Sequence, residues 1–135
     1  AEYGATTGRP RRCGWFDAVA LRHAARVNGF DALAITKLDV LDNFEEIKIC
    51  TAYKYKRKKM TEFPTSGAVL GFVEPVYETM PGWMASTSKI KKFKDLPKNA
   101  RAYLNRLEKL TGISVNIISV GAGRKEVIVR KNPFR

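Results

Sequence analysis

Residues 46–56 constrain the fold of this chain more than any other stretch. Along them, large apolar or hydroxyl-bearing side chains alternate with lysines and small side chains. Successive side chains of a β-strand point to opposite faces, so the pattern predicts a strand with one buried and one partly wet face. The buried face is expected to carry Ile47, Ile49, Thr51, Tyr53 and Tyr55, and the wetter face Lys48, Cys50, Ala52, Lys54 and Lys56. Such a strand needs neighbouring strands and a covering layer.

Helices and further strands are predicted on both sides of this stretch. Apolar side chains recur at helical spacing over residues 15–28 and 97–110, and Gly29 and Gly112 follow as stop signals. Short apolar runs predict three more strands, at 32–35, 113–117 and 126–130. The alternation of strands and helices favours an α/β fold with helices packed on a mixed sheet.

Two segments between these elements are predicted to be irregular. Residues 61–73 contain Pro64, Ser66 and Gly67, which interrupt regular structure. Residues 76–83 gather aromatic side chains around a Pro-Gly turn, and a packed surface loop is the expected structure.

The overall composition is that of one globular domain. The chain has 135 residues, of which 44% are hydrophobic, and no apolar run approaches the roughly 20 residues of a membrane span. Cys13 and Cys50 lack metal-ligand spacing and are expected to be reduced thiols in the cytoplasm, because no signal peptide is recognised. His23 is expected to be an exposed or half-buried helix residue.

The opening at Ala1, without an initiating Met, is interpreted as that of a piece cut from a longer protein.

The net charge predicts an anionic partner. The chain carries 25 Lys and Arg against 13 Asp and Glu, a formal net charge of +12. A phosphate-bearing small substrate is one candidate partner, and an acidic protein surface, which can belong to a missing part of the same protein, is a second. Nucleic acid is another, because Tyr53 and Tyr55 lie among the lysines that continue to Lys59. A solvated hairpin end is the favoured interpretation of that basic run, and the charge alone does not decide between the two function classes.

Residues 4–14, Gly-Ala-Thr-Thr-Gly-Arg-Pro-Arg-Arg-Cys-Gly, have the composition of an anion-binding loop. Glycines let backbone N–H groups approach an anion, threonine hydroxyls add donors, and arginine binds carboxylate or phosphate through two parallel hydrogen bonds. The Gly-Lys-Ser/Thr ending of a Walker loop is absent. A flexible basic terminus is the alternative, although the neighbouring Trp15 favours an ordered loop.

The segment Thr36-Lys37-Leu38-Asp39 follows the predicted strand 32–35, where ligands commonly bind in α/β sheets. A carboxylate such as that of Asp39 can accept hydrogen bonds from the ring N–H and the exocyclic amino group of guanine, a donor pair that adenine lacks. The stem of Lys37 can lie along the face of the base. A solvated lysine and a turn aspartate are the simpler alternative.

Four motifs in order resemble one family. Gly4–Arg9, Thr36–Asp42, Tyr77–Trp83 and Ser119–Gly121 closely resemble the C-terminal third of adenylosuccinate synthetase, and the similarity runs to Pro133-Phe134. The resemblance implies the C-terminal part of a mostly parallel-sheet, P-loop-NTPase-like α/β fold. It also implies an enzyme that ligates L-aspartate to IMP while GTP is split to GDP and phosphate, with Mg²⁺ holding the phosphates. The product, adenylosuccinate, leads to AMP in de novo purine biosynthesis.

The resemblance also assigns site residues. The aspartate- and IMP-binding loop would comprise Ala5, Thr6, Thr7, Gly8, Arg9 and Arg11, with Arg11 also reaching toward GTP. The guanine-binding residues would be Lys37, Leu38, Asp39, Ser119, Val120 and Gly121. Ala122 stands where many members of the family have proline, which affects the stiffness of that loop.

The same resemblance says what this chain is expected to lack. The family's catalytic Asp and His, its magnesium-binding Asp and its phosphate loop belong to the N-terminal part, so no catalytic or metal-binding residue is predicted here. Residues 1–135 are therefore predicted to form a single substrate- and guanine-binding portion that is inactive alone. A homodimer is expected for the full-length protein, without a membrane or a specific nucleic-acid partner. A small basic nucleic-acid-binding module is the alternative function.

Overall fold

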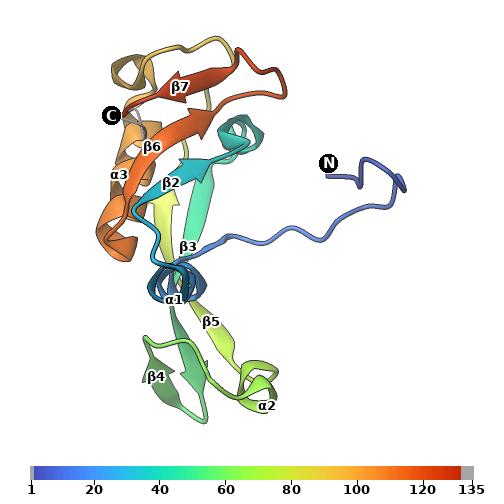
Figure 1. Ribbon diagram of the computed structural model, residues 1–135, viewed down its shortest axis with the longest axis vertical. Coiled ribbons are helices and arrows are strands. Elements are labelled where there is room, and N and C mark those ends of the chain that lie inside the picture. Colours follow the sequence, from blue (N-terminus) through green and yellow to red (C-terminus); the bar gives the residue numbers. More distant parts are fainter. Residues whose placement is uncertain (1, 132–135) are drawn as a thin grey trace.

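The computed structural model describes residues 2–131, which form two sheets and their covering helices (Figure 1). The helical elements are α1 (Ala18–Asn28), η1 (Leu38–Leu41), α2 (Gly67–Leu70), η2 (Phe93–Asp95) and α3 (Lys98–Thr111). The strands are β1 (Phe16–Asp17), β2 (Ala32–Ile35), β3 (Glu46–Tyr55), β4 (Lys58–Met60), β5 (Glu74–Pro81), β6 (Ser114–Ser119) and β7 (Val127–Val129).

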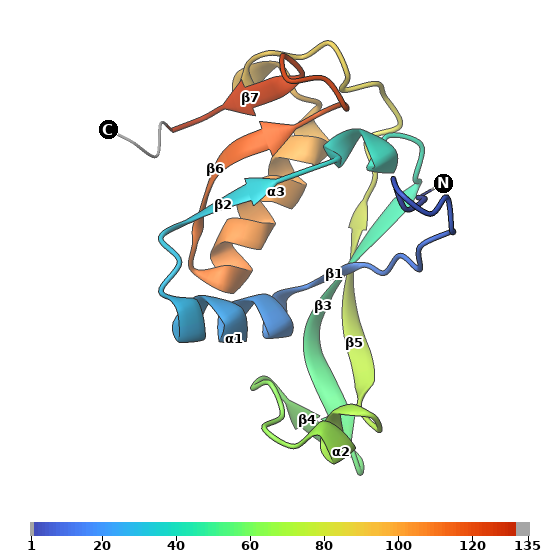
Figure 2. The same ribbon diagram turned by 45° about the vertical axis from the view of Figure 1, so that its right-hand side comes forward.

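The two sheets mix parallel and antiparallel pairs. In one sheet β3 pairs in parallel with β1 and antiparallel with β4 and β5. In the other, β6 lies between β2, which runs parallel to it, and the antiparallel β7. Helix α3 lies along the second sheet, and α1 runs across its base (Figure 2). The predicted α/β class, with helices packed on a mixed sheet, is confirmed.

The main core lies between α3 and the two sheets. Fully buried side chains from β3, α3, β6 and β7, among them Ile47, Leu104, Ile118 and Ile128, meet there. Beyond this core, β3 and β5 continue as a two-stranded arm that carries β4 and α2 near its end (Figures 1 and 2). A second, smaller cluster around Val19, Cys50 and Tyr53 packs where the arm leaves the body.

The two long helices agree with the sequence pattern, apart from their first residues. Helix α1 begins at Ala18 rather than at residue 15, because Phe16 and Asp17 are extended and pair with β3. Asp17 then caps the helix by accepting a hydrogen bond of 3.0 Å from the Ala20 N–H. Gly29 ends the helix in the left-handed region, at φ 68° and ψ 45°, as its position predicts.

The alternation predicted for β3 breaks in the middle of the strand. A β-bulge lies between Cys50, which pairs with Tyr77, and Ala52, which pairs with Val76, so Thr51 has no partner on β5. The extra residue interrupts the alternation locally, and Tyr53 and Lys54 beyond it keep their predicted faces. Thr51 is half-buried instead of buried, whereas Cys50 and Ala52, which were expected on the wetter face, are buried. The prediction was wrong at these positions because a bulge depends on the partner strand.

The segments predicted to be irregular contain regular structure. Residues 61–73 include α2, and the aromatic segment 76–83 is mostly the strand β5 and not a surface loop. Residues of β5 are exposed or half-buried, so apolar periodicity is weak there. Its backbone pairs with β3 from Glu46↔Pro81 to Lys54↔Glu74, a non-local interaction that the local sequence pattern does not indicate.

Strand β5 is joined to α3 by an ion pair between Glu78 and Arg106. The guanidinium donates from Nε and Nη2 to the two carboxylate oxygens, at 2.7 Å each. Hydrogen bonding to Arg106 is the main reason why the pKa of Glu78 lies below its usual range.

We expect Glu78→Gln to lower the free energy of unfolding by at most about 1 kcal/mol at neutral pH, because solvent screens side chains that are 33% and 34% exposed. The folded-state pKa of Glu78 is lowered, so the stabilising contribution is present above the unfolded pKa, near 4.5, and is lost as the pH falls through the folded value. Urea unfolding at pH 7 and pH 3 tests this, with exposed Glu74→Gln as the matched control. A difference that persists at pH 3 would contradict it.

Candidate functional site

The predicted guanine-binding segment leaves the carboxyl end of β2 through a strained residue. Lys37 has φ 59° and ψ 40°, in the left-handed region that residues other than Gly or Asn rarely adopt. Strained backbone is concentrated at functional sites. The next residue, Leu38, begins η1 and is only 1% exposed, so it anchors the segment in the core.

Asp39 lies in η1 and carries an unpartnered buried atom. Its Oδ1 is inaccessible to solvent and has no hydrogen-bond partner among the described residues. A buried carboxylate oxygen without a donor is costly, and native proteins seldom leave one in that state. The carboxylate therefore has unused capacity for a donor that a ligand would bring.

The predicted residues at the end of β6 lie beside this segment. Strands β2 and β6 are parallel, with Ile35 opposite Ile118, so Lys37 and Ser119 emerge from the same edge of the sheet. That edge is the expected ligand position in an α/β sheet. Val120 is fully buried and anchors the turn, while Ser119 Oγ donates to the Gly121 carbonyl oxygen at 2.8 Å. The structure thus brings together the two segments predicted to bind guanine.

The turn after β6 is closed by Glu126, which the sequence patterns did not single out. Its carboxylate Oε2 accepts a hydrogen bond of 2.6 Å from the Gly123 N–H, and its carbonyl oxygen accepts one of 2.9 Å from the Val120 N–H. A Cβ atom at Gly121 would lie 2.4 Å from the Glu126 Cδ. The glycine therefore makes room for the side chain that closes the turn.

The predicted aspartate and IMP loop is an ordered turn. The Gly4 N–H donates to the Arg9 carbonyl oxygen at 2.8 Å, and the Gly8 N–H donates to the Gly4 carbonyl oxygen at 2.9 Å. Gly8 has φ 65°, a conformation that favours glycine. All of the predicted substrate-binding residues of this loop are exposed: Ala5, Thr6, Thr7, Gly8, Arg9 and Arg11.

Glu2 connects this loop to the guanine-binding segment. Its carboxylate oxygens lie 3.4 Å from Arg11 Nη1 and 2.5 Å from Lys37 Nζ. The hydrogen bond from Lys37 is the main reason why the pKa of Glu2 lies below its usual range. Glu2 was missed by the sequence analysis because its partners lie 9 and 35 positions away.

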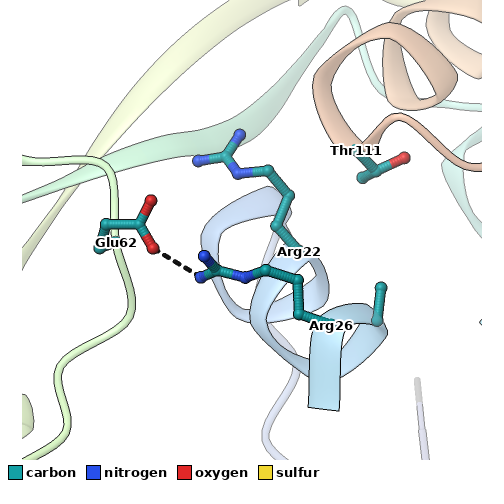
Figure 3. Close-up of a pocket in the computed structure, with 5 residues that line it drawn as sticks. Arg22, Arg26, Glu62 and Thr111 are labelled. Atoms are coloured by element: carbon teal, nitrogen blue, oxygen red, sulfur yellow. Dashed lines mark hydrogen bonds and ion pairs between the residues drawn. The ribbon is translucent and has the colours of Figure 1, made fainter. Parts of the chain in front are cut away.

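One pocket lies away from all of these residues. It has a volume of about 340 Å³ and is lined by Arg22, Ala25, Arg26, Glu62 and Thr111 (Figure 3). Arg22 already donates to the carbonyl oxygens of Leu110 and Thr61, at 3.0 Å each, and Arg26 pairs with Glu62 at 2.5 Å. Both guanidinium groups already have protein partners, so the arginines of this pocket connect α1 to neighbouring segments. The pocket is therefore not interpreted as a ligand site.

Among residues 2–131, no three His, Cys, Asp or Glu side chains lie close enough together to hold a metal ion. The only histidine, His23, is half-buried and stacks on Phe63 with ring centroids 4.9 Å apart. Across the same residues, no helix is both long enough and apolar enough to cross a membrane.

Comparison with known proteins identifies close relatives. The family model for adenylosuccinate synthetase matches residues 1–128. The chain is 53% identical to the adenylosuccinate synthetase of Magnetococcus marinus and 54% identical to that of Halorhodospira halophila, over 98% of this chain and 31% of each relative. A solved structure described as fully ligated adenylosuccinate synthetase from Plasmodium falciparum superposes with a TM-score of 0.91 at 39% identity, covering 96% of this chain and 32% of that one.

These matches decide between the two classes that the charge left open. They cover nearly the whole chain, so the alternative of a small basic nucleic-acid-binding module is not supported. The chain spans about a third of the length of the curated relatives that it matches. It belongs to the adenylosuccinate synthetase family, as a portion of the family's full length.

Proposed function

We propose that this chain is the guanine-, aspartate- and IMP-binding portion of an enzyme that joins L-aspartate to IMP while GTP is converted to GDP and phosphate. The product would be adenylosuccinate. Family membership supports the reaction class. The observation that supports the placement of GTP on this chain is the buried, unpartnered Oδ1 of Asp39 at the carboxyl edge of a sheet.

In this proposal the base is read by Asp39. After a side-chain rotation that turns the buried Oδ1 toward the ligand, its carboxylate accepts from the ring N–H and the exocyclic amino group of guanine, which gives that oxygen a donor. The stem of Lys37 covers the face of the base, and its ammonium group remains near Glu2. A backbone N–H of Ser119 or Gly121 faces the base oxygen, because the Val120 N–H already donates to the Glu126 carbonyl oxygen. The buried Leu38 and Val120 hold the two segments in register.

The loop that contains Thr6, Thr7, Arg9 and Arg11 binds the other substrates in this proposal. Threonine hydroxyls and nearby N–H groups donate to the aspartate carboxylates, with Ala5 and Gly8 allowing a close approach. Arg9 faces aspartate and IMP, and Arg11 reaches toward GTP. Glu2 holds Arg11 and Lys37 on either side of one carboxylate, so it aligns the two substrate-binding segments.

The phosphate chemistry is assigned to the rest of the full-length protein. Mg²⁺ would hold the phosphates of GTP, but residues 2–131 present no cluster that fits the ion, so no step at the metal is derived for this chain. We extend the proposal to a homodimer of the full-length protein that acts without a specific nucleic acid or a membrane. The cytoplasmic location stays a prediction.

The isolated 135-residue chain is expected to release no phosphate from GTP when IMP, aspartate and Mg²⁺ are present, because the groups that activate the phosphates are expected elsewhere. A hybrid synthetase, in which this chain replaces the matching third of the Halorhodospira halophila relative, is expected to release phosphate only when all three substrates are present. The intact relative is the control. Turnover by the isolated chain, or a folded but inactive hybrid beside an active relative, would contradict the proposal.

A further inference from the structure

Asp42 is a buried carboxylate at the end of η1, three residues after Asp39, and its two oxygens are fully occupied. It is 8% exposed. Oδ1 accepts hydrogen bonds from Trp83 Nε1 at 2.7 Å and from Thr87 Oγ1 at 2.9 Å, and Oδ2 accepts one from the Thr87 N–H at 2.8 Å. Asp42 thus contrasts with Asp39, whose Oδ1 has no partner among the described residues.

The donors come from residues 82–87, which follow β5 and press against the chain just after η1. The Gly82 N–H donates to the Glu45 carbonyl oxygen at 2.8 Å, and a Cβ atom at Gly82 would lie 1.7 Å from the Phe44 carbonyl oxygen. Thr87 is fully buried and Trp83 is 8% exposed. Residues 82–87 are therefore packed firmly against the chain after η1, and their hydrogen bonds hold Asp42 in place.

The structure of η1 itself does not determine its orientation. It is a four-residue 3₁₀ turn that begins at the strained Lys37 without a side-chain cap. Its internal hydrogen bonds, Val40 to Lys37 and Asp42 to Asp39, are 3.2 and 3.1 Å long. Short 3₁₀ turns have poor hydrogen-bond geometry, so external contacts decide how such a turn is oriented. The buried Leu38 fixes one end, and Asp42 fixes the other.

We propose that Asp42, Trp83 and Thr87 are positioning residues for base selection, because they set the direction in which Asp39 presents its carboxylate to guanine. The inference rests on the proposed function, because the three residues can act in base selection only if Asp39 binds the guanine base. Discrimination by hydrogen bonds depends on small displacements of the acceptor, and a misplacement of about 1 Å caused by a change at a distant residue can cost about 100-fold in rate. The three residues make no contact with nucleotide in this proposal.

The test compares GTP with ITP, whose base lacks the exocyclic amino group, in the hybrid synthetase. Asp42→Asn replaces an acceptor by an amide donor facing Trp83 and Thr87, so the carboxylate of Asp39 is expected to shift. We expect the selectivity for GTP over ITP, measured as the ratio of kcat/KM values, to fall about tenfold or more. The KM values for IMP and aspartate are expected to change less than about twofold, because this change leaves residues 4–14 intact.

Two comparisons separate positioning from simple loss of stability. Thr111→Val is the matched control, because Thr111 is also 8% exposed and hydrogen-bonded, with its Oγ1 donating to the Leu107 carbonyl oxygen at 2.7 Å. It is expected to lower the Tm without changing the GTP/ITP ratio. Thr87→Ser keeps the hydroxyl and is expected to retain most of the selectivity that Thr87→Val loses.

The outcomes distinguish this inference from the proposed function. If the hybrid shows no preference for GTP, or if Asp39→Asn leaves the preference unchanged, the proposed role of Asp39 fails. If Asp39→Asn removes the preference while folded Asp42→Asn retains it, only the positioning inference is overturned. Should Asp42→Asn not fold, Trp83→Phe removes one donor and keeps the ring, with a several-fold loss of selectivity expected. An unchanged ratio in Trp83→Phe would then overturn the inference.

Discussion

Asp39→Asn in the hybrid synthetase is expected to lower kcat/KM for GTP about 100-fold. The carboxylate would accept two hydrogen bonds from guanine, and hydrogen bonds to a charged group contribute about 1.5–3 kcal/mol each. An amide retains one acceptor and places a donor against the donors of the base. A net loss of about 3 kcal/mol corresponds to roughly 100-fold at 25 °C. Activity with ATP is expected to be low before the change and to be altered little by it, since adenine lacks the donor pair.

Steady-state kinetics with GTP and ATP measure this change. Asp31→Asn is a matched carboxylate-to-amide control, because Asp31 is exposed and precedes β2 at the opposite end of the strand from Asp39. It is expected to leave both nucleotides unaffected. An equal loss of GTP and ATP activity in Asp39→Asn would show that Asp39 supports the local structure and does not read the base.

Gly82→Ala is expected to destabilise the fold by about 3 kcal/mol or more, at the upper end of the range for added core volume. The new Cβ atom would lie 1.7 Å from the Phe44 carbonyl oxygen and 2.8 Å from the Phe44 carbonyl carbon. Both atoms belong to the backbone, so no side-chain rotation relieves the clash. The two backbone segments must separate, and the hydrogen bond from Gly82 N–H to Glu45 is lost.

Urea unfolding of the 135-residue chain, followed by circular dichroism, measures the loss of stability. Gly71→Ala is the matched control: Gly71 has φ −66° and ψ −16°, and its Cβ would make an ordinary contact of 3.6 Å with the Ala68 carbonyl oxygen. That change is expected to be neutral or slightly stabilising, because it reduces the entropy of the unfolded chain. Similar midpoints for Gly82→Ala and the unsubstituted chain would refute the close approach at Phe44.

The candidate site was predictable where short segments carry the information. Thr36–Asp39 and Ser119–Gly121 are each contiguous in sequence, and each follows a strand with an apolar pattern. Together with Gly4–Arg9 and Tyr77–Trp83, their order and spacing indicated the family, which the comparisons confirm. The supporting residues were not predictable in the same way. Glu2 meets Lys37 across 35 positions, and Asp42 meets Thr87 across 45, so their hydrogen bonds leave no local pattern.

The sequence by itself determined the two long helices, the strands β2, β3, β6 and β7, and the family. Helices α1 and α3 are encoded by apolar periodicity and glycine caps, both of which depend on residues within a few positions of one another. Only the tertiary structure decided the strand β5, the bulge at Thr51 and the orientation of η1. These features depend on pairing and packing between distant segments, and the free energy of such contacts exists only once the chain has folded.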